Sequence, residues 1–392
     1  MKKLIVATLF LLPPSMSALF GQIAAEQKPM TNKKGSQFVF TSVASNEATD
    51  VKNQGKSGTC WCYSTNSFLE SELLRMGKGK QDLSEMFTVR RAYTAKAERF
   101  VRRMGKAQFA EGGEFHDVLY VLKNYGIMPQ SAYAGKQKTF AHAEMDAILK
   151  NFIETIIKIP NGDRLTDDWK KAYEGILDAY SGAIPEKFEV NGKSMTPKEY
   201  AVSIGLNADD YVEITSYTHH PFYEPFVLEI PDNWADAAAY NVTVDELVEV
   251  ADNAVKKGYT IGWASDVSEK YFSHKNGIAV VPSKDWVDLS EEEQKAIFDK
   301  PTTERVISQE NRQLAFDDLS TQDDHGMHIT GLVKDQTGAE FFTVKNSWGA
   351  ERNDCGGYLY VSKNYFRYKT ISILVHKKAI PEKIAAKIFK KG

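Results

Sequence analysis

Cysteine is scarce in this sequence, with three residues among 392. A disulfide framework is therefore excluded, and an odd count leaves at least one thiol unpaired within the chain. Positive charge is not in excess either, because the formal net charge is −3 and the isoelectric point is about 6.3. That balance argues against nucleic acid as a partner. The composition, 42% hydrophobic and 26% charged, is otherwise typical of a globular protein.

Long hydrophobic runs are also missing. The apolar run Leu4–Leu12 follows Lys2 and Lys3, and it is too short to span a bilayer. Small residues come next, so residues 1–25 are predicted to be a secretory signal peptide that is cleaved between positions 18 and 25. A membrane anchor is the alternative, and no cysteine follows the run to carry a lipid. We expect an exported bacterial protein, periplasmic or extracellular, whose mature form does not contact a membrane.

The pattern of apolar residues changes along the chain. Helical spacing predicts helices from Trp61 to Met76, from Glu85, capped by Ser84, to about Met104, and from the Gly-Gly turn at 112–113 to Gly126. After position 259, short β-branched and aromatic runs predict an antiparallel sheet or barrel. The fold class is therefore α+β. We divide the mature chain into a helical N-terminal lobe (26–136), a helical insertion (137–258) and a β-rich lobe with a C-terminal tail (259–392).

The stretch "QGKSGTCWC" places Cys60 in a glycine-rich loop directly before the first helix. A thiol at a helix N-terminus meets unpaired N–H groups and the positive end of the helix dipole, which both favour the thiolate nucleophile. Gln54, six residues earlier, could donate its amide to an oxyanion beside the Cys60 N–H. The alternatives for Cys60 are a buried packing residue or a metal ligand with Cys62. The Cys-x-Cys spacing directs the two sulfurs apart, and no second Cys/His pair has ligand spacing, so we expect no metal.

A base and an orienting amide can be found near the end of the chain. His325 precedes one predicted strand, and Asn346 ends another. Two paired strands can set the imidazole beside the amide, with Trp348 covering their bond from water. His328 is the rival base. Three positions along a strand reverse the direction of a side chain, so only one of the two histidines can reach the sulfur, and we favour His325.

Four segments, "QGKSGTCW", "EGGEF", "DDHGMHITG" and "KNSWG" with "CGGYLYV", resemble in order the four conserved blocks of papain-like cysteine peptidases. Further segments, including "NADDYVEITSYTHHPFYEPF" and "KKGYTIGWASDV", resemble the bleomycin hydrolase and aminopeptidase C branch. The resemblance runs from about residue 38 to 376. It implies a two-lobe fold, with a helical left lobe, a β-barrel right lobe and a cleft between them.

The resemblance also implies roles for individual residues. Cys60 matches the nucleophile, His325 the base, Asn346 the orienting amide and Gln54 the oxyanion donor. The remaining matches concern the substrate and its surroundings: Gly112 and Gly113 let a substrate backbone approach, and Trp348 shields the imidazole. No cofactor is implied. The branch implies a homo-hexameric ring.

Some features depart from the family. Ser57 stands where papain-type enzymes have a disulfide cysteine, and Thr59 and Gly326 are mild changes. In the branch, the terminal carboxylate of a C-terminal arm receives the substrate amine. Here the tail "KKAIPEKIAAKIFKKG" is rich in lysine and would repel an ammonium group, apart from the single carboxylate of Gly392.

Other candidates receive structural interpretations. We expect Cys62 to be a packed thiol, with a disulfide to Cys355 as the alternative. His116 is expected to pack or to face solvent, and His219 and His220 to be solvated or near the cleft. The sequon at Asn241 carries no weight in a bacterial export.

We conclude that the chain is a cysteine peptidase acting on peptides through a Cys-His-Asn thioester mechanism. We hypothesise that activity requires a Cys60 thiolate and a His325 imidazolium together. An aminopeptidase of the bleomycin hydrolase type is the leading interpretation. An endopeptidase or oligopeptidase with an open cleft, and a silent peptide-binding module, are the alternatives. A nucleic-acid-associated protein would instead show steeply salt-dependent binding.

Overall fold

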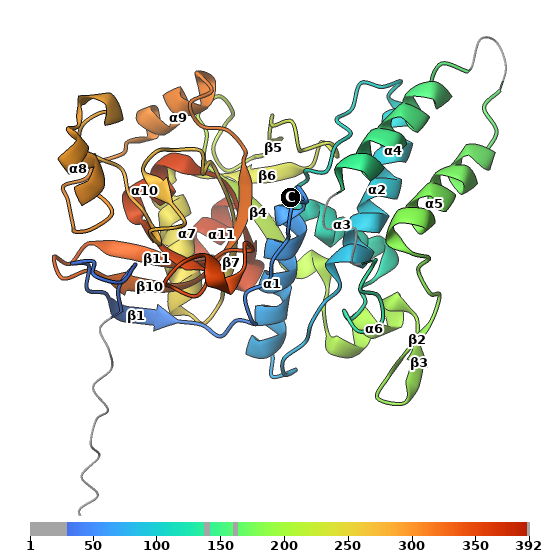
Figure 1. The fold of residues 1–392 in the computed structure, drawn as a ribbon, viewed down its shortest axis with the longest axis horizontal. Helices are drawn as coiled ribbons and strands as arrows, with labels where there is room; N and C mark the ends of the chain where they lie inside the picture. The colour runs from blue at the N-terminus through green and yellow to red at the C-terminus, as the bar shows by residue number, and fades with distance from the viewer. Residues whose placement is uncertain (1–29, 137–141, 160–163, 390–392) are drawn as a thin grey trace, which may run out of the picture.

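The computed structural model describes residues 30–136, 142–159 and 164–389. A helical half and a strand-rich half meet along helix α1 (Cys60–Arg75), as Figure 1 shows. The predicted signal peptide lies outside the described residues. Within the described part, no helix has the length and apolarity needed to cross a bilayer.

The three helices predicted for the N-terminal lobe are confirmed as α1, α2 (Glu85–Arg102) and α3 (Phe115–Tyr125). Ser84 caps α2 as expected, because its hydroxyl accepts a hydrogen bond from the N–H of Phe87 at 3.0 Å. Helix α3 ends at Gly126, whose φ of 86° is left-handed and therefore favours glycine.

The region 137–258 contains helices and also strands. Its helices are α4 (Ala143–Ile156), α5 (Asp168–Ser181), α6 (Pro197–Ile204), α7 (Val244–Lys256) and the 3-10 turn η2 (Ala208–Asp210). Its strands are β2 (Phe188–Val190), β3 (Lys193–Met195), β4 (Tyr211–Thr215), β5 (Pro225–Val227) and β6 (Ala238–Asn241). The helical expectation missed that β4 pairs with β13 and so joins the large sheet. That this region is an insertion stays a prediction.

The strands expected after position 259 are confirmed and form most of one sheet. They are β7 (Ile261–Ser265), β8 (Phe272–Ser273), β9 (Ile278–Ala279), β10 (His325–Lys334), β11 (Glu340–Lys345), β12 (Tyr358–Ser362) and β13 (Thr370–His376). The order is β5-β6-β4-β13-β7-β10-β11-β12-β9-β8, and β1 (Thr41–Ser45) pairs with β10. Neighbours are antiparallel except in the β4–β6 and β9–β12 pairs. The remaining segments are η3 (Trp286–Asp288), α8 (Glu291–Ala296), α9 (Gln309–Asp317), η4 (Ala350–Arg352), α10 (Lys363–Lys369), η5 (Lys377–Ala379) and α11 (Glu382–Ile388).

Each half of the molecule has its own apolar core. Phe68, Phe87 and Phe115 are fully buried among the helices, and Trp263 and Phe342 are fully buried under the sheet. Replacing a buried phenylalanine of this kind by alanine costs about 3–5 kcal/mol. The two cores hold α1 against β10. Cys60, the first residue of α1, lies at the boundary between the two cores.

The basic tail is helical and docked on the strand-rich half. Ile384 and Ile388 of α11 are buried, and Lys387 Nζ lies 2.7 Å from Glu246 Oε1 of α7. The ring of Phe389 then packs edge-on against Tyr240, with 5.2 Å between ring centroids. Gly392, the candidate carboxylate of the tail, lies outside the described residues.

Candidate active site

Cys60 is the first residue of α1, so its position follows from where the helix begins. The first helical bonds are donated by the N–H groups of Cys62 and Tyr63 to the carbonyl of Thr59. The N–H groups that precede them are therefore free of helical partners, and the Trp61 N–H lies at the Cys60 sulfur together with the Gly326 N–H. Burial nevertheless dominates and raises the pKa of the Cys60 thiol to about 12.

His325 and Asn346 lie together, as the strand pairing predicted. His325 begins β10, Asn346 follows β11, and these two strands are neighbours in the sheet. The His325 Nε2 lies 2.7 Å from the Asn346 Oδ1. The same oxygen accepts the N–H of Ser347 at 2.7 Å, so it is the acceptor and the imidazole proton belongs on Nε2. The Nδ1 of a neutral His325 is then the basic nitrogen.

Burial lowers the pKa of His325 to about 4, and the bond to Asn346 opposes this shift only in part. An isolated imidazolium is thus disfavoured here, as an isolated Cys60 thiolate is. One proton transfer between the two groups would create both charges at once, and each charge would then stabilise the other.

Cys60 and His325 line the same pocket between the two halves of the molecule. Gly326 lets β10 come close to α1, because a Cβ at this position would lie 2.8 Å from the Ser64 hydroxyl. Trp348 lies over the imidazole, with ring centroids 4.7 Å apart and planes tilted by 32°. Trp348 therefore packs against the imidazole, and its shielding of the His–Asn bond from water stays a prediction.

The structure places Gln54 behind the nucleophile loop. Its side chain is buried, its Nε2 donates to the Ser57 carbonyl at 2.9 Å, and its Oε1 accepts from the Ser347 hydroxyl at 2.6 Å. Gln54 is not among the residues that line the pocket of Cys60 and His325. One Nε2 hydrogen remains that could serve an oxyanion, so the predicted role of Gln54 stays a prediction.

The Gly-Gly pair also leaves room for a side chain of this protein. Gly113 lines the pocket, but a Cβ on Gly112 would lie 1.9 Å from an oxygen of Asp232. The carboxylate of Asp232 therefore occupies the space beside Gly112. Lys96 Nζ supports this loop from the helix α2 side by donating to the Ala110 carbonyl at 2.9 Å and to that of Gly112.

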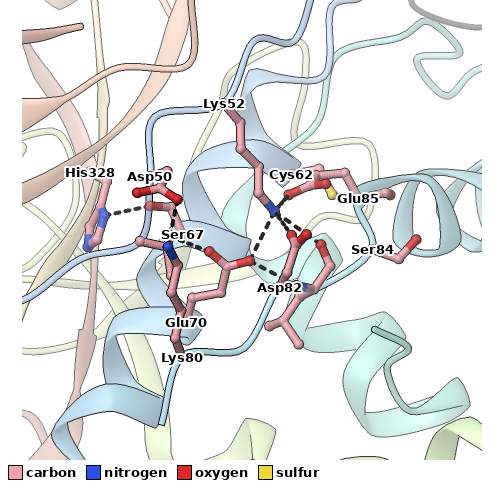
Figure 2. Close-up of polar contacts among 12 residues, drawn as sticks. Asp50, Lys52, Cys62, Ser67, Glu70, Lys80, Asp82, Ser84, Glu85 and His328 are labelled. Atoms are coloured by element: carbon pink, nitrogen blue, oxygen red, sulfur yellow. Dashed lines mark hydrogen bonds and ion pairs between the residues drawn. The ribbon is translucent and has the colours of Figure 1, made fainter. Parts of the chain in front are cut away.

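His328, the rival base, points away from the nucleophile, as predicted. Its Nδ1 lies 2.9 Å from the Ser67 hydroxyl, and that hydroxyl accepts from Lys345 Nζ at 2.7 Å. Figure 2 shows the His328–Ser67 bond and the contacts of Lys52 with Glu70 and Glu85. Lys345 links the two groups, because its Nζ also donates to the Thr49 hydroxyl, which in turn donates to Glu70. Burial, together with the charge of Lys345, lowers the pKa of His328, which is thus held neutral in a structural role.

The three cysteines are free, so the alternative of a Cys62–Cys355 disulfide is wrong. Cys62 is buried, with its sulfur 3.5 Å from the Glu85 carbonyl (Figure 2). Cys355 donates to the Asn32 carbonyl at 2.8 Å. The packed thiol predicted for Cys62 is confirmed.

The remaining histidines lie in other clusters. His116 is bonded to Glu213 at 3.1 Å, and this carboxylate and Asp117 outweigh burial and raise the pKa of His116 to about 9. Among the described residues, the group with metal-ligand geometry is His219, His220 and Glu229. That group does not involve Cys60 or Cys62.

Several residues of the site were not predicted from the sequence. His274 lies 3.3 Å from the Asn346 amide nitrogen through its Nδ1, and Glu114, Asp232 and Asp323 line the pocket of Cys60. They come from distant segments that only the tertiary fold brings together. Glu114 was visible in the sequence as the residue after the Gly-Gly pair, and Asp323 as a near neighbour of His325, but a charge in a loop is ordinarily solvated.

A thiol at the start of a helix and an imidazole held by an amide, lining one pocket between a helical and a strand-rich half, define a papain-like cysteine peptidase. The chain belongs to the Peptidase C1-like family, whose model matches residues 17–159 and 185–391. Aminopeptidase E of Lactobacillus helveticus is 24% identical over 85% of this chain and 82% of its own. Bleomycin hydrolase of Gallus gallus is 22% identical over 89% of this chain and 84% of its own.

The fold comparison agrees. The crystal structure of PepW from Lactobacillus rhamnosis superposes with a TM-score of 0.70 at 19% identity, and it covers 89% of this chain and 84% of that chain. The predicted α+β papain-like fold is therefore confirmed.

Proposed function

We propose that this chain is a cysteine aminopeptidase of the bleomycin hydrolase type, with Cys60 as nucleophile and His325 as general acid and base. The observation that carries the proposal is the 2.7 Å His325–Asn346 bond in the pocket that Cys60 shares. The names of the relatives, aminopeptidases and bleomycin hydrolase, support the choice of substrate.

The chemistry begins with one proton transfer. The Cys60 thiol gives its proton to His325 Nδ1, and the thiolate attacks the scissile carbonyl carbon to form a carbon–sulfur bond. The carbonyl electron pair moves to oxygen, where the Cys60 N–H and the remaining Gln54 amide hydrogen would stabilise the oxyanion. The oxyanion collapses, the carbon–nitrogen bond breaks, and His325 gives its proton to the leaving amine.

The second half restores the enzyme. Water gives a proton to His325 and its oxygen attacks the thioester carbonyl carbon. Collapse of that intermediate breaks the carbon–sulfur bond, releases the amino acid and returns the proton from His325 to the sulfur. Asn346 keeps the imidazole in one tautomer throughout, and Trp348 limits the access of water to their bond.

A matched pair of fluorogenic substrates tests the proposal. Alanyl-aminomethylcoumarin (alanyl-coumarin below), which has a free amine, and its N-acetyl derivative are assayed with the reduced wild type and with the Cys60→Ala variant. We expect cleavage of the free-amine substrate alone, and none by the variant. Cleavage of both substrates would make the chain an endopeptidase, and binding without turnover would make it a silent peptide-binding module.

Export and a homo-hexameric assembly are further parts of the proposal. The apolar run and small residues of positions 1–25 support export, and N-terminal sequencing of the protein secreted by its host would test it by locating the cleavage site. The hexamer rests on the family resemblance. Light scattering of the purified mature chain would test it, and a monomeric mass would contradict it.

A further inference from the structure

The pocket around Cys60 is lined by carboxylates from three separate segments. Glu114 precedes α3, Asp232 lies between β5 and β6, and Asp323 precedes β10. Among the described residues that line this pocket, none is a lysine or an arginine. Asp324 also lies at the wall, but its Oδ2 accepts the N–H groups of Val267 and Ser268 at 3.2 and 3.1 Å. Glu114, Asp232 and Asp323 are therefore the three acids of this pocket that can contact a ligand.

Glu114 has an unused acceptor. Its side chain is 3% exposed, and within the described part of the chain its Oε1 has no hydrogen-bond partner. Its carboxyl group lies against that of Asp323. Burial and this neighbour raise the pKa of Glu114, and burial raises that of Asp323 to about 6. A buried carboxyl oxygen without a donor is costly, so Oε1 favours a ligand that brings an N–H donor into the pocket.

Asp232 is held in place by its own loop. The next residues anchor it, since Trp234 Nε1 donates to the Asp117 carboxylate at 2.8 Å and Asn233 Nδ2 donates to the Leu228 carbonyl at 2.9 Å. Further along, Asp236 forms ion pairs with Arg99 and Arg103 of α2. The missing side chain of Gly112 gives the Asp232 carboxylate room to approach. A loop fixed at several points presents its charge with little loss of entropy on binding.

The positive charge nearby is already committed. Lys96 lowers the pKa of Asp232 through its charge, against the larger effect of burial. Its Nζ, however, donates to the carbonyls of Ala110 and Gly112. Lys96 therefore positions the loop and leaves the pocket side of the acids open.

The reaction brings an ammonium group to this place. In an N-terminal residue the α-nitrogen is two covalent bonds from the scissile carbonyl carbon, which is roughly 2.5 Å. With that carbon at the Cys60 sulfur, the nitrogen must lie within the same pocket. An ammonium group offers three N–H donors and one positive charge, which fits an acidic pocket whose three carboxyl groups face no lysine or arginine among the described lining residues.

We propose that Glu114, Asp232 and Asp323 form the site that receives the free α-ammonium group of the substrate's first residue. This inference rests on the proposed aminopeptidase function, and it assigns recognition of the amine to side chains of the lobes. The family resemblance would assign it to the carboxylate of the tail, whose described part ends with Phe389 against Tyr240.

Binding is measured separately from turnover. Iodoacetamide alkylation of Cys60 is followed by mass spectrometry in the presence of alanyl-alanine or N-acetyl-alanyl-alanine. We expect protection by the free-amine dipeptide only, and about a tenfold loss of that protection in Asp232→Asn and Glu114→Gln, equivalent to about 1.4 kcal/mol. Asp209→Asn, which removes an exposed charge paired with Lys123, serves as the matched control and should protect as wild type does.

The outcomes are distinct. Equal protection in wild type and both pocket variants would overturn the inference, and so would loss of protection only on deletion of residues 390–392. Protection by N-acetyl-lysyl-alanine that the pocket variants lose would assign the acids to a basic side chain instead. Protection by the free-amine dipeptide without cleavage of alanyl-coumarin would overturn the proposed function and leave the amine site standing. Melting temperatures of the variants show whether they are folded.

Discussion

The Oδ1 atom of Asn346 lies 2.7 Å from the Nε2 atom of His325. Because the Ser347 N–H donates to the same oxygen, the amide cannot turn its nitrogen to the imidazole without losing that bond. The pair therefore fixes one tautomer of His325 and leaves Nδ1 as its basic nitrogen. The proposed proton transfers depend on this orientation.

Replacing Asn346 by alanine should remove this control. We expect kcat on a free-amine substrate to fall about 10²-fold while KM changes little, because the imidazole samples the wrong tautomer and orientation. Asn151→Ala, which removes an exposed amide that bonds only within α4, is the matched control and should leave kcat unchanged. Unchanged kcat in Asn346→Ala would contradict the orienting role.

The reactivity of Cys60 should depend on His325. Burial raises the pKa of the thiol to about 12, so at pH 6 a thiol without a proton acceptor reacts slowly with iodoacetate. With His325 present, proton transfer supplies the thiolate. We expect the rate of Cys60 carboxymethylation at pH 6 to fall at least about tenfold in His325→Ala, measured by mass spectrometry. Equal labelling of the two proteins would contradict the thiolate–imidazolium hypothesis.

Activity on free-amine substrates should fall as the pH drops through about 6. Burial raises the pKa of Asp323 to about 6, so this carboxylate is charged above that pH and takes up a proton below it, which weakens its hold on an ammonium group. The titratable groups around it are Glu114, Asp232, Asp324, Glu213 and His116, with Cys60 and His325 in the same pocket. The pKa of His116 is about 9, so its charge does not change near pH 6. Burial lowers the pKa of His325 to about 4, so the free imidazole titrates below this range.

The measurement is kcat/KM for alanyl-coumarin between about pH 5 and 8, in wild type and in Asp323→Asn. The variant should have a lower plateau and should lack the decline near pH 6. A decline that is unchanged in Asp323→Asn would assign it to another group.

The grouping of Cys60, His325 and Asn346 could be predicted because each residue stands beside a local signal: a glycine-rich loop before an apolar helix for Cys60, and strand ends for His325 and Asn346. Their catalytic roles stay predictions. The three N-terminal helices and the late strands follow from periodicity for the same reason. The direction of His328 also followed from strand geometry, and its bond to Ser67 confirms that it faces away from the nucleophile.

The acidic residues of the pocket could not be predicted from the sequence, because only contacts between segments far apart in the chain bring them beside Cys60. Asp232 is about 120 residues from Gly112 along the chain, and the two meet only through the anchoring of the 231–236 loop on α2 and α3. Strands β4 to β6 were missed for a related reason. They are short, and they join the large sheet through β4, which pairs with β13 from the far end of the chain.

Position 112 gives a test of how tightly this loop is built. A Cβ there would lie 1.9 Å from an Asp232 oxygen and 2.5 Å from the carboxyl carbon, so Gly112→Ala must displace the Asp232 side chain. We expect a loss of about 1–3 kcal/mol in the free energy of unfolding, as for other overpacked sites. We also expect a higher KM for free-amine substrates.

Gly175→Ala is the matched control, since that glycine lies within helix α5 with nothing within 4 Å of its added Cβ. Alanine is the better helix former, so this variant should gain up to about 1 kcal/mol and keep its KM. Urea denaturation of both variants measures the first effect, and steady-state kinetics the second. A Gly112→Ala protein that is as stable as wild type, with an unchanged KM, would mean that Asp232 is free to move and does not hold the amine.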